Sequence, residues 1–416
     1  MRHLFVKILR IEIIFTTEVE DFIKHKGPKI TYTRQPLQNE FFIRSNDLLF
    51  EQGINQFEIR LEDWESVPCF FNAGEGSSIP FDIFAASFYL LSRYEEYLPF
   101  VKDFHGRFPP TESLAYKNDF LHLPVVDIWA FKLFDKLKLR FPDIVTKKRR
   151  FQYTSVIDVT TSHSYAFRGI FRGMAGMFLD IGTFRFKRVF QRIGVWLKIK
   201  QDPYDNFSLL MQYHKEFPCK TIFFFQFADY STYDKNVSPE NNKFRYLIKS
   251  VADYSIVSLA ASYSSFSNLE LLKQEKKRLS DVIHRPVKLT RMRYNRVDIP
   301  STYRNLTEAE FTDDFSMGYT HNIGFRAGTC SPFNFYDIHM EVQQPIRVHP
   351  FAVHDYALLK YNSKKEILQE LDAICSQIKQ VEGELTTVFS NELLGGSHKV
   401  KWLDLYRNIL AKYHVQ

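Results

Sequence analysis

The sequence predicts an α/β protein in which a smaller N-terminal α/β domain precedes a distorted (β/α) barrel of about seven strands. In the second part of the chain, short apolar runs alternate with amphipathic stretches at helical spacing, which is typical of a parallel sheet or barrel. The 416 residues exceed the size of one average domain. A polar, basic stretch at 141–150 separates two patterned regions, so we place the domains at residues 1–147 and 148–416.

The first region mixes strand and helix patterns. Alternating apolar residues predict strands at 11–15, 28–32 and 57–61. Residues 80–98 begin with proline and carry apolar residues at helical spacing, so they predict a buried helix, and residues 123–139 predict another. We find no motif of known chemistry in this half of the chain.

The second region contains seven candidate strands, each short and mostly apolar. They are Tyr153–Val159, Thr221–Phe227, Ile256–Leu259, Val287–Leu289, Phe311–Met317, Ile346–Val348 and Leu385–Phe389. Helices are predicted between several of them, at 206–217, 268–283 and 363–380, the last with Ser363 as its N-cap. In (β/α) barrels the chemistry lies at the carboxyl ends of the strands, so functional residues are expected there.

The composition is that of an ordinary soluble protein, with 45% hydrophobic and 25% charged residues and a formal net charge of +7. The densest basic run, at 147–150 (KKRR), precedes a predicted strand. A solvated linker explains it better than a nucleic-acid contact, and we expect no nucleic-acid partner.

Residues 168–200 combine eight Arg and Lys residues with interleaved apolar residues. Two interpretations of this segment remain open. Helices that pack on the main domain are the favoured one. The other is an amphipathic surface in peripheral contact with acidic lipid or polysaccharide.

The cysteines and the apolar runs indicate the compartment. Cys69, Cys219, Cys330 and Cys375 lie far apart and form no C-x-x-C pair, which argues against a cysteine zinc site. Charges interrupt the apolar N-terminal stretch, and no run approaches the ~18 apolar residues of a membrane span. We therefore expect a cytoplasmic protein with reduced thiols.

Several motifs follow strand ends in a recognisable order. They are Asp158, Ser262-Tyr263, Arg291, the FRAGTCSPF stretch at 325–333, Tyr336-Asp337, the HPF stretch at 349–351 and Asn391-Glu392. In this order they resemble the polysaccharide deacetylases (NodB-type, carbohydrate esterase family 4-like). The N-terminal region resembles the accessory domain of one branch of that family, through DLLFE at 47–51 and LSRYEEY at 91–97.

The resemblance implies a NodB-like (β/α) barrel and metal-dependent hydrolysis of an N-acetyl group from a glycan or glycan precursor. In the family, a divalent metal held by one Asp and by imidazoles polarises the acetamide and activates water. By the same resemblance, Asp158 occupies the position of the general base, and Ser390 that of the His that acts as the acid. The positions that would line the substrate cleft are Tyr263, Arg291, Arg293, Arg326, Asn391 and Glu392.

The positions of the metal ligands have changed together. Where the family has its ligand Asp this chain has Thr160 or Thr161, and where it has His residues it has Ala260 and Arg293. Thr is a weak neutral ligand, Ala offers no ligand, and a protonated Arg repels a cation. Ser390 cannot act as an acid near neutral pH. We therefore expect no metal site and no cofactor.

A rearranged zinc site is the alternative, with His163 and His349 as replacement ligands beside Asp158. Without a metal, the retained carboxylate of Asp158 needs a cation as its partner. Arg326 and Arg293 are the candidates for that partner.

Three hypotheses about function follow. The favoured one is a degenerate polysaccharide-deacetylase relative, a pseudoenzyme that binds a saccharide or a protein partner and has an arginine-lined pocket. The second is an active metal-dependent carbohydrate N-deacetylase with altered ligands, which requires His163 or His349 beside Asp158. The third is a protein-interaction scaffold in which bulky side chains close the barrel cleft. The sequence leaves the glycan, the partner and the oligomeric state open.

Overall fold

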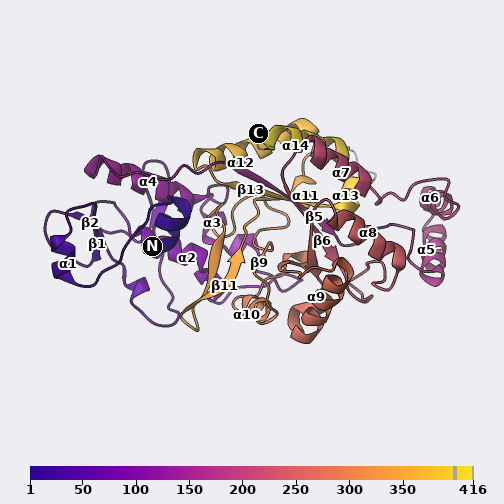
Figure 1. Cartoon of the computed structure of the whole chain (residues 1–416), viewed down its shortest axis with the longest axis horizontal. Coiled ribbons are helices and arrows are strands. Elements are labelled where there is room, and N and C mark those ends of the chain that lie inside the picture. Colours follow the sequence, from indigo (N-terminus) through magenta and orange to yellow (C-terminus); the bar gives the residue numbers. More distant parts are fainter. Residues whose placement is uncertain (397–400, 415–416) are drawn as a thin grey trace.

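The computed structural model describes residues 1–396 and 401–414 and contains two large apolar cores (Figure 1). Apart from Tyr319 and Ile338, the first core is built from side chains of residues 4–137. The second core is built from side chains of residues 153–413. The first core lies at one end of the molecule and the large sheet lies at its centre (Figure 1).

The N-terminal region has four short helices and two small sheets within the described residues. Their bounds are α1 Val19–Lys24, β1 Ile30–Thr33, β2 Phe41–Arg44, β3 Leu61–Asp63, β4 Pro68–Phe70, α2 Ile83–Leu91, α3 Leu114–Lys117 and α4 Val125–Arg140. Helix α2 begins after Asp82, whose carboxylate accepts hydrogen bonds from the backbone N–H groups of Phe84 and Ala85. The predicted helices at 80–98 and 123–139 are confirmed as α2 and α4.

Two strand predictions in this region are wrong. Residues 11–15 form no strand, and Leu61 is the sole residue of the predicted strand 57–61 that lies in β3. Ile11 and Ile13 are half-buried against the first core, whereas the side chains of Ile14 and Phe15 are exposed. No described strand pairs with residues 11–15, and without a partner strand the alternating pattern does not become a strand.

The largest sheet of the described residues has nine strands in the order β10-β11-β9-β8-β7-β6-β5-β13-β12. All neighbours pair in parallel except β10 and β11, which are antiparallel. The bounds are β5 Gln152–Val159, β6 Lys220–Gln226, β7 Ile256–Ala261, β8 Leu289–Met292, β9 Asp313–Asp314, β10 Phe333–Asp337, β11 Val342–Val348, β12 Val353–His354 and β13 Glu384–Ser390. Each of the seven predicted strands overlaps one of these, and β10 and β12 were not predicted.

The sheet curves strongly but is not a closed barrel. Strands β5 and β8 are three strand spacings apart, about 14 Å in a flat sheet. Nevertheless the carboxylate of Asp158 on β5 lies 2.8 Å from the guanidinium of Arg291 on β8. The hydrogen-bonded order of the described strands stays open between β10 and β12, so the predicted barrel closure is not observed. The edge strand β12 has two residues and offers few backbone hydrogen bonds for closure.

Helices cover the outside of the sheet and the C-terminal helices run along one edge of the molecule (Figure 1). Their bounds are α7 Phe207–Glu216, α8 Asn242–Ala252, α9 Leu269–Ile283, α10 Ser301–Glu308, α11 Asp355–Leu358, α12 Lys364–Gln380, α13 Asn391–Gly395 and α14 Trp402–Tyr413. The predicted helices at 206–217, 268–283 and 363–380 are confirmed as α7, α9 and α12. Ser363 caps α12 as predicted, because its hydroxyl accepts a hydrogen bond from the N–H of Glu366.

Helices α5 Ile170–Gly182 and α6 Phe186–Trp196 stand apart from the sheet at the end opposite the N-terminal region (Figure 1). They pack on each other, whereas the favoured expectation placed them on the main domain. The helices of residues 1–396 and 401–414 include none that is long and apolar enough to cross a membrane.

A buried ion network joins the N-terminal region to the sheet region. Both guanidinium nitrogens Nε and Nη2 of Arg326 donate to the carboxylate of Glu96, at 2.9 and 2.6 Å. Arg93 donates to the same carboxylate at 2.8 Å and to Glu95 at 2.6 Å. All four side chains are less than one tenth exposed. The charges therefore neutralise one another within the junction.

The Glu96→Ala variant should lose roughly 3–5 kcal/mol of unfolding free energy, because Arg326 would keep its buried charge and lose its carboxylate. Urea denaturation followed by tryptophan fluorescence measures this loss. Glu58→Ala is the matched control, since Glu58 pairs with Arg60 on the surface and both side chains are about four-fifths exposed. We expect less than about 1 kcal/mol there. Equal losses in the two variants would contradict the structural role of the network.

Candidate binding site at the carboxyl ends of the strands

The centre of the concave face is occupied by an ion pair. Oδ2 of Asp158 accepts a hydrogen bond of 2.8 Å from Nε of Arg291, and its Oδ1 is buried without a hydrogen-bond partner in the described part of the chain. Arg291 also donates to the carbonyl of Phe315 and to the side chain of Asn295, and its guanidinium lies 4.7 Å from the ring centroid of Phe351. Arg291 is 1% exposed, so it fills the interior and lines no open cleft.

The expected cation partner of Asp158 is therefore present, but it is Arg291 and not Arg326 or Arg293. Arg326 is held by Glu96 at the junction between the two regions. Arg326 was expected in the substrate cleft; its guanidinium is bonded to Glu96, and the residue also lines a hollow of about 190 Å³. The reason is that the stretch containing Arg326 contacts the N-terminal region, which the order of motifs could not reveal.

The side chains at the positions expected to bind the metal or to supply the acid contact other protein groups. Oγ1 of Thr160 donates to Oε1 of Glu392 at 2.5 Å, and Ser390 donates to Oδ2 of Asp355 through both its N–H and its hydroxyl, each at 2.6 Å. Ala260 belongs to the apolar cluster on the inner face of the sheet. Within residues 1–396 and 401–414, His, Cys, Asp and Glu side chains form no group of three that could hold a metal ion. The donor set therefore does not fit the family's metal.

The two candidate replacement ligands are engaged separately. Nδ1 of His163 lies 3.0 Å from Oγ of Ser162, and burial lowers the pKa of His163 although Asp202 opposes this. Nε2 of His349 lies 2.7 Å from Oδ1 of Asp313, and the His349 ring stacks on Phe315. The structure does not bring these two histidines together with Asp158 in a ligand group.

Asn391 and Tyr263, both expected to line the substrate cleft, contact other protein groups. Asn391 is fully buried, and its amide donates to the carbonyl of Thr161 at 3.0 Å. Tyr263 stacks on Tyr233 with ring centroids 4.1 Å apart, and the guanidinium of Arg296 lies 4.0 Å from the Tyr263 ring centroid. Tyr263 thus belongs to an aromatic cluster at the ends of β6 and β7, while Asn391 fixes the loop after β5.

Arg293 and Glu392 lie near the rim with Tyr356. Burial raises the pKa of Tyr356 to about 12, the charge of Glu392 adds to the rise and the charge of Arg293 opposes it. The guanidinium of Arg293 lies 4.4 Å from the ring centroid of Tyr294. Its Nε is buried without a hydrogen-bond partner, and no carboxylate of the described residues pairs with it.

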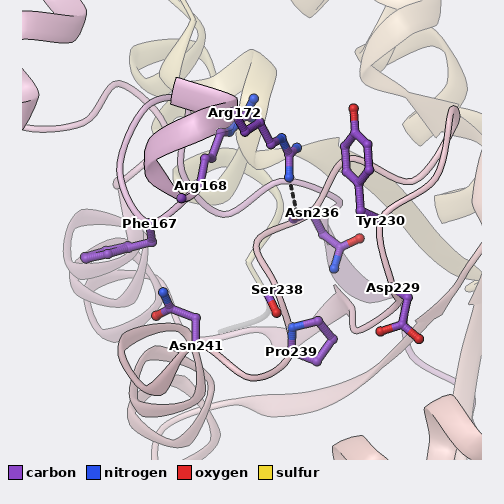
Figure 2. Close-up of a pocket in the computed structure, with 10 residues that line it drawn as sticks. Phe167, Arg168, Arg172, Asp229, Tyr230, Asn236, Ser238, Pro239 and Asn241 are labelled. Carbon is purple, nitrogen blue, oxygen red and sulfur yellow. Dashed lines mark hydrogen bonds between the residues drawn. The ribbon is translucent and has the colours of Figure 1, made fainter. Parts of the chain in front are cut away.

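A hollow of about 370 Å³ lies between the loop after β5 and the loop after β6 (Figure 2). Two arginines, aromatic rings, amides and a hydroxyl surround it. The lining residues are Phe167, Arg168, Gly169, Arg172, Asp229, Tyr230, Asn236, Ser238, Pro239 and Asn241. We refer to this hollow as the arginine pocket. A smaller hollow of about 190 Å³ lies between residues 103–110 and residues 318–322.

The arginine pocket holds two cations that lack a carboxylate partner. Arg172 donates to the carbonyls of Asn236 and Lys235 at 3.1 and 2.6 Å, and its guanidinium lies 4.2 Å from the Tyr230 ring centroid. Nε of Arg168 donates to the carbonyl of His163 at 3.0 Å. Among the described residues no Asp or Glu oxygen lies within salt-bridge distance of either guanidinium.

The electrostatics of the arginine pocket favour an anion. Burial lowers the pKa of Arg168 and Arg172 from the usual value, and the charge of Arg168 lowers the pKa of Arg172 further. The nearby charges of Glu392 and Asp202 oppose the fall in the pKa of Arg168. The carboxylate of Asp229, which also lines the pocket, is bonded to Arg278 at 3.0 Å. An anion placed between the two guanidiniums would relieve their mutual repulsion and accept charge-assisted hydrogen bonds.

Sequence reasoning named Arg168 and Arg172 as members of a basic segment but did not assign them to a site. Two signals were available: the arginines stand four residues apart and they follow the carboxyl end of β5. The polar residues Asn236, Ser238 and Asn241 follow β6 in the same way. Loops after neighbouring parallel strands meet at one edge of a sheet, so the arginines after β5 and the polar residues after β6 are expected to lie close together.

One family model and several solved structures are similar to parts of the chain. Residues 1–142 match the model of a family of unknown function (DUF7033). No curated protein matches the chain.

The chain is similar to a protein described as a polysaccharide deacetylase from Mycobacterium smegmatis, with 11% identity, a TM-score of 0.42 and coverage of 64% of this chain and 84% of the other. It is similar to Puue allantoinase, with 12% identity, a TM-score of 0.41 and coverage of 64% and 84%. It is also similar to the 4-alpha-glucanotransferase from Thermococcus litoralis, with 14% identity, a TM-score of 0.35 and coverage of 64% and 38%.

A buried carboxyl group positions the loop that carries Tyr263. Glu275 on α9 accepts a hydrogen bond of 3.1 Å from the N–H of Ser262. Burial raises the pKa of Glu275 to about 7, and the nearby charge of Asp234 adds to the rise. The folded protein therefore holds a proton on Glu275 at pH values where the unfolded chain has lost it.

Because the pKa of Glu275 is higher in the folded state, its contribution to stability is complete below about pH 4.5 and is lost as the pH rises towards about 7. The Glu275→Gln variant should not show this loss. Its free energy of unfolding, relative to that of the wild type, should therefore rise by on the order of 3 kcal/mol from pH 4 to pH 8. Urea denaturation across that range measures the difference. Glu270→Gln, on the exposed side of the same helix, should follow wild type at every pH. Parallel wild-type and Glu275→Gln profiles would contradict the raised pKa.

Proposed function

We propose that this chain binds an anionic saccharide in the arginine pocket and does not hydrolyse it. The observation that carries the proposal is that two arginines, Arg168 and Arg172, line a hollow of about 370 Å³ and have no carboxylate within salt-bridge distance among the described residues. Ligand pockets commonly have volumes of about 300–1,000 Å³, so the hollow has the size of a binding site. The negative group of the ligand would be a carboxylate, which matches the planar guanidinium.

The remaining lining residues support a sugar as the body of the ligand. Asn236, Ser238 and Asn241 offer amide and hydroxyl groups for hydrogen bonds with sugar hydroxyls. Phe167 and Tyr230 offer flat apolar rings, against which the C–H faces of sugars pack. The resemblance of the motif order to the polysaccharide deacetylases points to the same chemical class. That resemblance also implies the finer fold, a NodB-like barrel, which the curved sheet of parallel strands supports.

The absence of hydrolysis is proposed from the chemistry of the positions that would carry it. The expected ligand positions offer no suitable donors. Thr160 has a hydroxyl that is already bonded to Glu392, Ala260 has a methyl group, and Arg293 has a guanidinium. The hydroxyl at the expected acid position, Ser390, donates to Asp355. We infer a degenerate relative of the deacetylases, and we derive no reaction step through a metal.

Titration calorimetry with a carboxylated oligosaccharide and its neutral reduced counterpart tests this function. We expect binding of the carboxylated ligand alone, and Arg168→Ala and Arg172→Ala should each weaken it by about tenfold or more, because each removes a charge-assisted hydrogen bond. Arg285→Ala is the matched control, since Arg285 is exposed and precedes β8 at the opposite end of the strands. Equal affinity for the two ligands, or equal loss in the control, would refute the proposal.

The hypothesis of an active deacetylase is tested by bound metal. Elemental mass spectrometry of protein incubated with zinc, cobalt or nickel should find no stoichiometric ion. One tightly held ion per chain, lost in His163→Ala or His349→Ala, would favour the rearranged site and overturn the non-catalytic proposal.

A further inference from the structure

The helical hairpin α5–α6 has a polar interior. Oδ2 of Asp180 accepts a hydrogen bond of 2.6 Å from Arg192, and both side chains are about one-tenth exposed or less. Arg192 also donates to the carbonyl of Gly173 at 3.3 Å. A Cβ atom at Gly173 would lie 2.7 Å from the ring of Trp196, and one at Gly176 would lie 2.9 Å from the guanidinium of Arg192. The helices thus approach closely over glycines and bury an ion pair between them.

Most of the large apolar side chains of the hairpin lie on its outside, whereas Val189 and Val195 are buried. The outer ones recur at intervals of three or four residues along each helix, so each helix presents one apolar stripe. The exposed members are Phe171, Met174, Phe178 and Ile181 on α5, Phe184 between the helices, and Phe186, Phe190, Ile193 and Leu197 on or directly after α6. Phe171 is 86% exposed and Phe190 is 69% exposed. An apolar surface of this extent is unusual on a monomer and indicates a binding surface.

The same segment carries the positive charge of the chain. Residues 168–200 contain eight Arg and Lys residues and one acid, Asp180, which gives a formal charge of +7. The whole chain also has a formal net charge of +7, so the positive and negative charges of the residues outside 168–200 cancel. The acid is buried and paired with Arg192. The exposed basic residues of the hairpin are Arg185, Lys187, Arg188, Lys198 and Lys200.

We propose that the α5–α6 hairpin docks this protein onto the surface of an anionic lipid bilayer. Exposed aromatic and aliphatic stripes with flanking Lys and Arg are the combination that binds the interface of acidic membranes. A protein partner is the weaker fit, because protein interfaces are depleted of Lys and this surface is rich in it. Neither helix spans the bilayer, since 13 residues of α5 extend for roughly 20 Å. The hairpin therefore lies in the plane of the interface.

Flotation of the full chain with vesicles tests the docking. We expect binding to vesicles of phosphatidylcholine with phosphatidylserine and much weaker binding to phosphatidylcholine alone, with a loss of affinity as salt increases. The double variant Phe178→Ser/Phe190→Ser removes apolar contact, and Arg185→Glu/Lys187→Glu reverses charge. Each should weaken binding by tenfold or more.

Phe104→Ser is the matched control, because Phe104 is 85% exposed but lies in the N-terminal region. All substituted side chains are exposed, so thermal melting should show an unchanged fold. Absence of binding to the acidic vesicles, or equal binding by the hairpin variants, would overturn the proposal. So would sedimentation showing a dimer that the phenylalanine variants abolish, because the stripes would then join two copies. Binding of the carboxylated oligosaccharide should be unchanged in these variants, which separates this proposal from that of the arginine pocket.

Discussion

The ion pair between Asp158 and Arg291 is the interaction on which the concave side of the sheet depends. It links β5 to β8 across two intervening strands, and the same guanidinium reaches the carbonyl of Phe315 and the side chain of Asn295. Arg291 is buried and the side chain of Asp158 is 14% exposed, and removal of Asp158 would leave the buried guanidinium without compensation. Arg291 and the buried apolar cluster beside it therefore fill the centre of the concave face.

Arginines at the rim and at the domain junction satisfy their charge in different ways. Arg326 and Arg93 share the carboxylate of Glu96 in a buried network, where each cation has an anion and no ligand is needed. Arg168 and Arg172 bond to backbone carbonyls and line a hollow. A carbonyl satisfies an N–H group but neutralises no charge. Arg168 and Arg172 therefore leave a positive electrostatic potential in a concave site, and this potential attracts an anion.

The strands were predictable because a buried parallel strand is a continuous apolar run, as in Thr221–Phe227. That Asp158 needs a cation as its partner was also predictable. Which residue supplies that cation was not, because Arg326 pairs with Glu96, 230 positions away in the sequence. The arginine pocket escaped prediction for a different reason. It is built from two loops that have no periodicity, and its concavity exists only after both loops are placed. The wrongly predicted strand at 11–15 shows the converse: Ile11 and Ile13 pack on the first core, but no described strand pairs with the segment.

The arginine pocket and the hairpin are mechanically connected. Arg172 belongs to α5, yet its guanidinium bonds to the carbonyls of Lys235 and Asn236 in the loop after β6. This bond fixes the base of the hairpin to the wall of the pocket, and the buried pair of Asp180 and Arg192 fixes the two helices to each other. The orientation of the apolar stripes relative to the pocket is therefore set by side chains and not by a free linker. With the stripes in a bilayer interface, the pocket would lie within about one helix length, roughly 20 Å, of the lipid headgroups. A saccharide held at that surface would reach the two arginines without crossing bulk solvent, whereas a saccharide free in solution would gain nothing from the hairpin.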